Sequence, residues 1–169
     1  MYDISEKLII YNFIIKRLAN GVVFSNKKLN IIVKKIESDI EKCKELLNMY
    51  RNSTSELNKL KYSSSINTIF NDIQNEISNF NILYMKEIYK NIKTIYLTLL
   101  NSESSFSSDD LLGLLENVVY FKEQFTYNKS VICDDSMKEY EAIINNLDKM
   151  DKDINTFLNS LPKNKNHKL

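Results

Sequence analysis

Apolar residues recur at every third or fourth position along most of the chain, a spacing that places them on one face of an α-helix. The periodic segments cover residues 3–20, 27–50, 66–100, 108–125 and 136–161. Residues 53–62 form either a short extra helix or a continuation of the second segment. Strand candidates at 22–24 and 131–133 are too short to build a sheet. The pattern therefore predicts an all-α protein, a bundle of five to six helices.

The first and last segments distribute their apolar residues differently. The last one opens with a capping box of Ser136 and Glu139 and ends before Pro162. Its apolar residues form a strict heptad stripe: Tyr140, Ile143, Leu147, Met150, Ile154, Phe157 and Leu161. Residues 3–20 are apolar around nearly the whole helix, which is typical of a helix in the middle of a core. We expect the first helix to be buried all round and the last to bury one face.

The segment 66–100 is the longest periodic stretch in the chain. As one helix it would span about 50 Å at about 1.5 Å per residue, which is long for a domain of this size. Serine and asparagine cluster at 78–81, and both residue types favour helix ends over helix interiors. We expect a break or kink there. The alternative is one unbroken helix in an elongated protein.

The second segment, 27–50, carries charged residues along both edges of its apolar stripe. One edge is basic and the other acidic: Lys28, Lys35 and Lys42 against Glu37, Glu41 and Glu45. Charges beside an apolar seam are typical of coiled-coil edges, where they select the partner and its orientation. These residues are therefore candidates for a partner-facing surface, and a solvated helix face is the alternative.

Length and composition favour one domain over residues 1–162, followed by a flexible basic tail at 163–169. The chain of 169 residues has only two glycines and one proline, and a few long helices need few such turn residues. Abundant Ile, Lys and Asn with scarce Ala indicate an A/T-rich genome, such as that of a virus, phage or parasite.

The charge is nearly balanced but unevenly distributed along the chain. The formal net charge is +1. Residues 1–100 hold 15 basic and 10 acidic groups, a net +5, whereas residues 101–169 hold 8 and 12, a net −4. Such asymmetry is typical of complementary packing between halves or between subunits. The expected partner is another protein, or a second copy in a homo-oligomer.

Residues with the chemistry of a catalytic or metal site are few and scattered. The single histidine, His167, lies in the predicted tail, and the two cysteines, Cys43 and Cys133, are far apart. We therefore predict no catalytic residues, no metal site and no cofactor. No stretch approaches the roughly 20 apolar residues of a membrane span. Unpaired cysteines and the absence of a signal peptide favour the cytosol, bacterial or that of an infected host.

One helical face has the residue types of a nucleic-acid contact. Lys86, Lys90 and Lys93 fall on one face, and Tyr89 and Tyr96 lie at its edges. Lysines at this spacing contact phosphates and tyrosines stack on bases. The near absence of arginine, with two in the chain, weighs against specific recognition of nucleic acid.

These observations favour a non-catalytic helical protein that binds another protein, as an adaptor, an assembly subunit or an inhibitor. An exposed apolar or aromatic patch of a few hundred Å² would identify such a surface. Aromatic residues near predicted loops, Tyr62, Phe106 and Tyr127, are candidates for it. The alternative is a protein that binds the nucleic-acid backbone through its lysine-rich amino-terminal portion.

Overall fold

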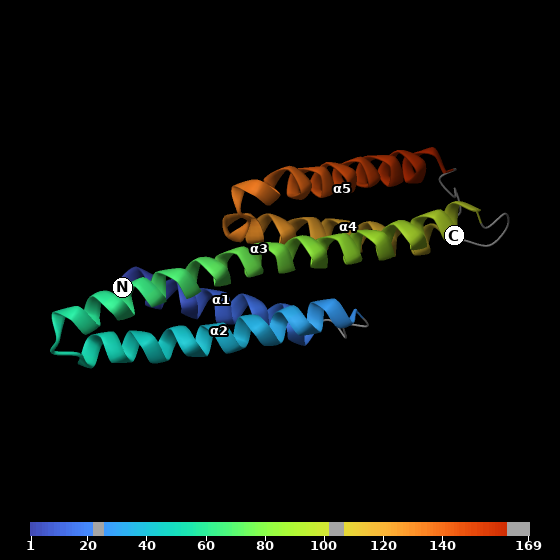
Figure 1. Cartoon of the computed structure of the whole chain (residues 1–169). Coiled ribbons are helices and arrows are strands. Elements are labelled where there is room, and N and C mark those ends of the chain that lie inside the picture. Colours follow the sequence, from blue (N-terminus) through green and yellow to red (C-terminus); the bar gives the residue numbers. More distant parts are fainter. Residues whose placement is uncertain (22–25, 102–106, 162–169) are drawn as a thin grey trace, which may run out of the picture. The chain divides into compact units, whose positions relative to one another are not determined.

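The computed structural model describes residues 1–21, 26–101 and 107–161, and 94% of these residues are helical. The described residues form five α-helices, labelled in Figure 1, and a short 3-10 helix. They are α1 (Tyr2–Gly21), α2 (Lys27–Asn52), α3 (Glu56–Asn101), α4 (Ser108–Tyr127), η1 (Asn128–Val131) and α5 (Asp134–Ser160). No strand occurs among the described residues, so the predicted all-α bundle is confirmed. The predicted tail at 163–169 lies outside them.

Polar side chains define where several of these helices begin. The Asn26 side chain accepts a hydrogen bond from the Lys28 backbone N–H (3.0 Å) and caps α2. Ser107 caps α4 in a capping box with Asp110, whose N–H donates to the Ser107 hydroxyl. The expected capping box at Ser136 is wrong, because α5 already begins at Asp134. An acidic residue in that first turn is favoured by the helix dipole.

The expected break at 78–81 is wrong, because α3 is one continuous helix from Glu56 to Asn101. The two polar residues that are buried in this stretch, Ser78 and Asn81, are hydrogen-bonded. The Asn81 side-chain amide donates to the Ile77 carbonyl (2.9 Å), and the Ser78 hydroxyl accepts from the Cys133 backbone N–H (2.8 Å). A buried polar group destabilises a helix interior mainly when it lacks a partner, and the helix therefore continues through this stretch.

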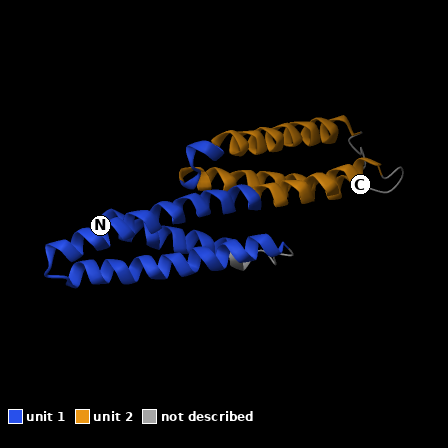
Figure 2. Cartoon of the chain, in the orientation of Figure 1, with its two compact units in different colours: residues 1–84, 131–136 blue, residues 85–130, 137–169 orange. Residues whose placement is uncertain are grey.

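The chain divides into two compact units, drawn in different colours in Figure 2. Unit 1 comprises residues 1–84 with 131–136, and unit 2 comprises residues 85–130 with those from 137 onward. The helix α3 contributes its first part to unit 1 and its last part to unit 2. The single domain over 1–162 stays a prediction.

Three helices supply the core of unit 1. Its fully buried residues include Leu8 and Ile15 of α1, Leu29, Ile36 and Ile40 of α2, and Ile66, Ile73 and Ile77 of α3. Tyr11 stacks on Phe70 with ring centroids 6.0 Å apart, and the Tyr11 hydroxyl accepts a hydrogen bond from the Gln74 amide (3.3 Å). The core of unit 1 therefore covers α1 on one face.

In unit 2, the heptad stripe of α5 is the main contribution to the core. Tyr140, Ile143, Leu147, Met150 and Ile154 are buried, as are Leu111, Leu114, Val118 and Phe125 of α4. The Tyr140 hydroxyl donates to the Phe125 carbonyl (3.2 Å). The predicted burial of one face of the last helix is confirmed, with Phe157 and Leu161 half-buried near its end.

Candidate protein-binding surface

The most exposed group of large apolar side chains on a single helix lies on α1. Tyr2, Ile9, Ile10 and Phe13 have exposed fractions of 77%, 67%, 53% and 64%. The expectation that this helix is buried all round is therefore wrong. It packs in unit 1 through Ile4, Leu8, Tyr11 and Ile15, which recur at fours and threes on one face. The other apolar residues of α1 face away from the core of unit 1.

The outward-facing residues form a second stripe with regular spacing. We define the outer stripe of α1 as Tyr2, Glu6, Ile9, Phe13 and Lys16, all of which are exposed. The intervals alternate between four and three residues, which keeps the five side chains on one face. Ile10 lies beside this stripe. The four apolar residues expose on the order of 500 Å², since a large side chain of this kind offers roughly 150–250 Å².

A small groove between α1 and α2 adjoins the outer stripe at Ile9. Its volume is about 190 Å³. It is lined by Ser5, Leu8, Ile9, Lys44, Leu47, Asn48 and Arg51. The Arg51 guanidinium donates to the Ser5 hydroxyl (2.7 Å), and Lys44 pairs with Glu41 (2.8 Å). The apolar surface of α1 is thus bordered by polar groups that already have partners in unit 1.

The charged edges of α2 were predicted as a partner-facing surface. Lys28, Lys35, Lys42, Glu37, Glu41 and Glu45 are all exposed. Three of them have partners within unit 1, because Lys35 pairs with Glu76 of α3, Lys42 with Asp39 and Glu41 with Lys44. The Lys35 pair connects two helices of the unit. That the edges contact another protein stays a prediction.

The predicted nucleic-acid face on α3 is partly occupied by acidic residues of α5. Lys86 forms an ion pair with Glu139, while Lys90 and Lys93 are exposed. Tyr89 and Tyr96 are half-buried. Burial raises the pKa of Tyr96 above its ordinary value, and the negative charge of Asp153 adds to the rise. Carboxylates next to this face weaken its attraction for phosphate.

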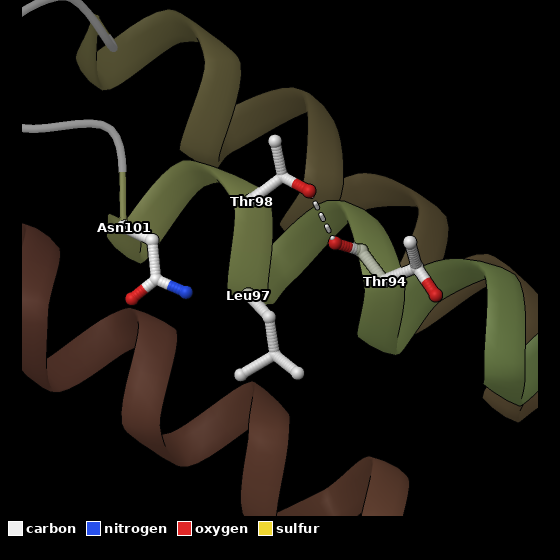
Figure 3. Close-up of a pocket in the computed structure, with 4 residues that line it drawn as sticks. All are labelled: Thr94, Leu97, Thr98 and Asn101. Carbon is white, nitrogen blue, oxygen red and sulfur yellow. Dashed lines mark hydrogen bonds between the residues drawn. The ribbon is translucent and has the colours of Figure 1, made fainter.

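Two open pockets in unit 2 are lined by few side chains that could take part in a reaction. The first has a volume of about 510 Å³ and is lined by Thr94, Leu97, Thr98 and Asn101. Figure 3 shows the Thr98 hydroxyl bonded to the Thr94 carbonyl (2.8 Å), and the Thr94 hydroxyl donates to the Lys90 carbonyl. Both hydroxyl protons are therefore used within α3.

The second pocket, about 470 Å³, is lined by Lys122, Glu123, Thr126 and Tyr127. The Lys122 ammonium is held by Asp151 (2.9 Å) and Asp148 (3.0 Å). Hydrogen bonds to Asp151 and then to Asp148 raise the pKa of Lys122, so it stays charged at neutral pH. A lysine in this state is neither a nucleophile nor a general base.

The cysteines differ in their surroundings. Cys43 is buried in the core of unit 1, and burial raises the pKa of its thiol. Cys133 is half-buried, with its sulfur 3.6 Å from the Asn75 side-chain oxygen and 3.8 Å from the Gln74 carbonyl. Among the described residues, no group of three or more His, Cys, Asp or Glu side chains could hold a metal ion. His167 lies outside the described residues.

The aromatic residues near predicted loops differ in how exposed they are. Tyr127 is exposed, Tyr62 is half-buried, and Phe106 lies outside the described residues. Ile9 and Phe13 of the outer stripe belong to the segment 3–20, which the sequence predicts to be buried all round. A signal for their exposure was present, because Glu6 and Lys16 interrupt their stripe while Ile4, Leu8, Tyr11 and Ile15 are uninterrupted.

None of the described helices is long and apolar enough to cross a membrane. Comparison of the chain with protein-family models, with curated proteins and with solved structures yields no match.

Proposed function

We propose that this is a non-catalytic protein that acts by binding another protein through the exposed apolar face of α1. The observation that carries the proposal is the grouping of Tyr2, Ile9, Ile10 and Phe13 on one helix, each more than half exposed. An apolar patch of about 500 Å² has the size of the largest patch on a typical monomer, and such patches are often functional. Roles consistent with it are those of an adaptor, an assembly subunit or an inhibitor.

The physical driving force is the removal of this surface from water. At about 25 cal/mol per Å², covering 500 Å² on one partner contributes roughly 10 kcal/mol before the entropic costs of association. A helix presented on a folded unit is already ordered, so little backbone entropy is lost on binding. Side chains that lie alternately four and three residues apart on a helix fit a groove or another helix as the complementary surface.

Other functional classes have less support among the described residues. The alternative is a nucleic-acid-backbone contact through the lysine-rich amino-terminal portion, which includes the lysines of α3, but the pairing of Lys86 with Glu139 removes part of that charge. The pockets in unit 2 combine hydroxyls and a lysine that already have partners. The proposal places the protein in a bacterial or host cytosol and its gene in an A/T-rich viral, phage or parasite genome.

The test is affinity capture from the organism that encodes the chain, with three baits compared side by side. The baits are the wild-type chain, Phe13→Glu in the outer stripe, and Leu57→Glu, which changes a leucine that is 77% exposed on α3. We expect a partner that is retained by the wild-type and Leu57→Glu baits and lost with Phe13→Glu. Equal retention by all three baits, or no retained protein at all, contradicts the proposal.

A further inference from the structure

We infer that the partner of the outer stripe of α1 is a second copy of this chain, with the two α1 helices antiparallel about a two-fold axis. The inference rests on the proposed function and names the occupant of the same surface. It follows from the order of residues along the stripe, from the charges at its ends and from its area.

The order of residues makes the stripe complementary to itself when reversed. Positions 2, 9 and 16 are seven residues apart, and positions 6 and 13 form the second heptad position between them. In an antiparallel helix pair, one heptad position packs against the other. Reversal about residue 11 therefore places Ile9 opposite Phe13 of the second copy, and Phe13 opposite its Ile9. The centre of the contact is apolar on both sides.

The same register brings opposite charges together at both ends of this apolar centre. Glu6 falls opposite Lys16 of the second copy, and the two-fold axis repeats the pair. Both side chains are exposed, and neither has an ion pair within the described residues of its own chain. Parallel helices would instead place Glu6 against Glu6 and Lys16 against Lys16. The charges therefore select the antiparallel arrangement.

The available area is enough for a specific but reversible dimer. Because an isologous contact uses the same patch twice, two apolar faces of about 500 Å² bury on the order of 1,000 Å² in total. The stems of Glu6 and Lys16 add to this sum. Specific interfaces begin near this size. We therefore expect the fraction of dimer to rise with protein concentration within the range that sedimentation equilibrium measures.

The test uses reversal of charge on the full-length chain, followed by sedimentation equilibrium at several concentrations. Glu6→Lys and Lys16→Glu each place like charges opposite one another twice in a homodimer, and we expect each to raise the dissociation constant at least about tenfold. Mixing the two single variants restores opposite charges at both ends, so the mixture should associate as a heterodimer. The double variant, with both changes in one chain, should associate like the wild type.

Matched controls carry charge reversals of the same size on α3. Asp72→Lys and Lys61→Glu alter exposed residues outside the outer stripe and outside the charged edges of α2, and they should leave the dissociation constant unchanged. Unchanged thermal melting of the Glu6 and Lys16 variants in dilute solution would show that both still fold. Equal effects of the α3 controls, or no recovery in the mixture, overturn the proposed register.

Failure of this inference can be distinguished from failure of the proposed function. If the wild-type chain stays monomeric at every concentration, the inference that the partner is a second copy is wrong. The proposed function then stands if Phe13→Glu still abolishes capture of a different protein, and it falls if no captured protein depends on Phe13. Association of the wild type that is lost in both single variants and regained in their mixture supports the inference.

Discussion

At the scale of single residues, each unit contains a polar side chain that bonds to a distant part of the chain. Lys122 of α4 lies between Asp148 and Asp151 of α5, and its side chain is 27% exposed. In unit 1, the Ser78 hydroxyl accepts from the Cys133 backbone N–H. Each contact joins segments that are far apart in sequence, so each is specified by tertiary packing and can be removed by one substitution.

Replacing Lys122 with Met should lower the free energy of unfolding by about 1 kcal/mol at neutral pH, because two carboxylates lose their shared cation. The folded-state pKa of Lys122 is raised, so its contribution is fully present below the unfolded-state value and is lost as pH rises through the raised value. The free energies of unfolding of the wild type and the variant, measured with urea, should therefore converge at strongly alkaline pH.

Lys149→Met is the matched control for this measurement, since Lys149 is an exposed lysine of α5. Its unfolding free energy should stay close to that of the wild type across the same pH range. A Lys122→Met deficit that persists unchanged above the raised pKa would show that lost packing, rather than lost charge, is responsible.

Replacing Ser78 with Ala should lower the free energy of unfolding by about 1–2 kcal/mol, because the Cys133 N–H loses its acceptor in a partly buried setting. Hydrogen exchange of the Cys133 amide should become faster in the variant. Ser64→Ala, at an exposed serine of the same helix, is the control and should change neither quantity. Unaltered exchange at Cys133 would argue against a stabilising role for this hydrogen bond.

At the scale of helices, α1 and α5 differ in how many of their apolar faces are buried. The stripe of α5 is buried in unit 2, with Leu147 fully buried, whereas α1 buries one of its two apolar faces. The periodicity of α5 predicted its packing because one apolar stripe leaves a single possible inner face. The sequence of α1 offered two such faces, and hydrophobicity alone did not separate them.

Replacing Leu147 with Ala should cost about 2–5 kcal/mol of stability, the usual range for truncating a buried leucine. Thermal or urea unfolding would measure this loss. Asn145→Ala, at an exposed position of α5, should have little effect. A Leu147→Ala chain as stable as the wild type would mean that the α5 stripe is not a core surface in solution.

At the scale of the whole molecule, the charge is close to balance and gives little long-range attraction for nucleic acid. The formal net charge is +1, and both arginines lie in the first 51 residues. One of them, Arg51, donates to Ser5. Affinity for a phosphate backbone depends on how many phosphates are neutralised, and a nearly neutral chain neutralises few.

We therefore expect a gel-shift titration at physiological salt to show no tight complex with DNA or RNA. Any weak binding should decline steeply as salt is added, as expected for contacts with phosphate alone. Nanomolar binding that disappears when Lys86, Lys90 and Lys93 are changed to Glu would contradict this prediction and favour the nucleic-acid alternative.

The sequence by itself determined that the chain is helical and which residues of α5 face inward, because apolar spacing specifies an angle around a helix axis. It placed residues 53–62 in a short extra helix or in the second segment, whereas residues 56–62 belong to α3. Only the tertiary structure decided that α3 continues past Ser78 and Asn81 and that α1 leaves Ile9 and Phe13 exposed. The physical reason is that both outcomes depend on neighbours distant in sequence. The backbone of Cys133 supplies the partner for Ser78, and the core of unit 1 covers α1 on one face.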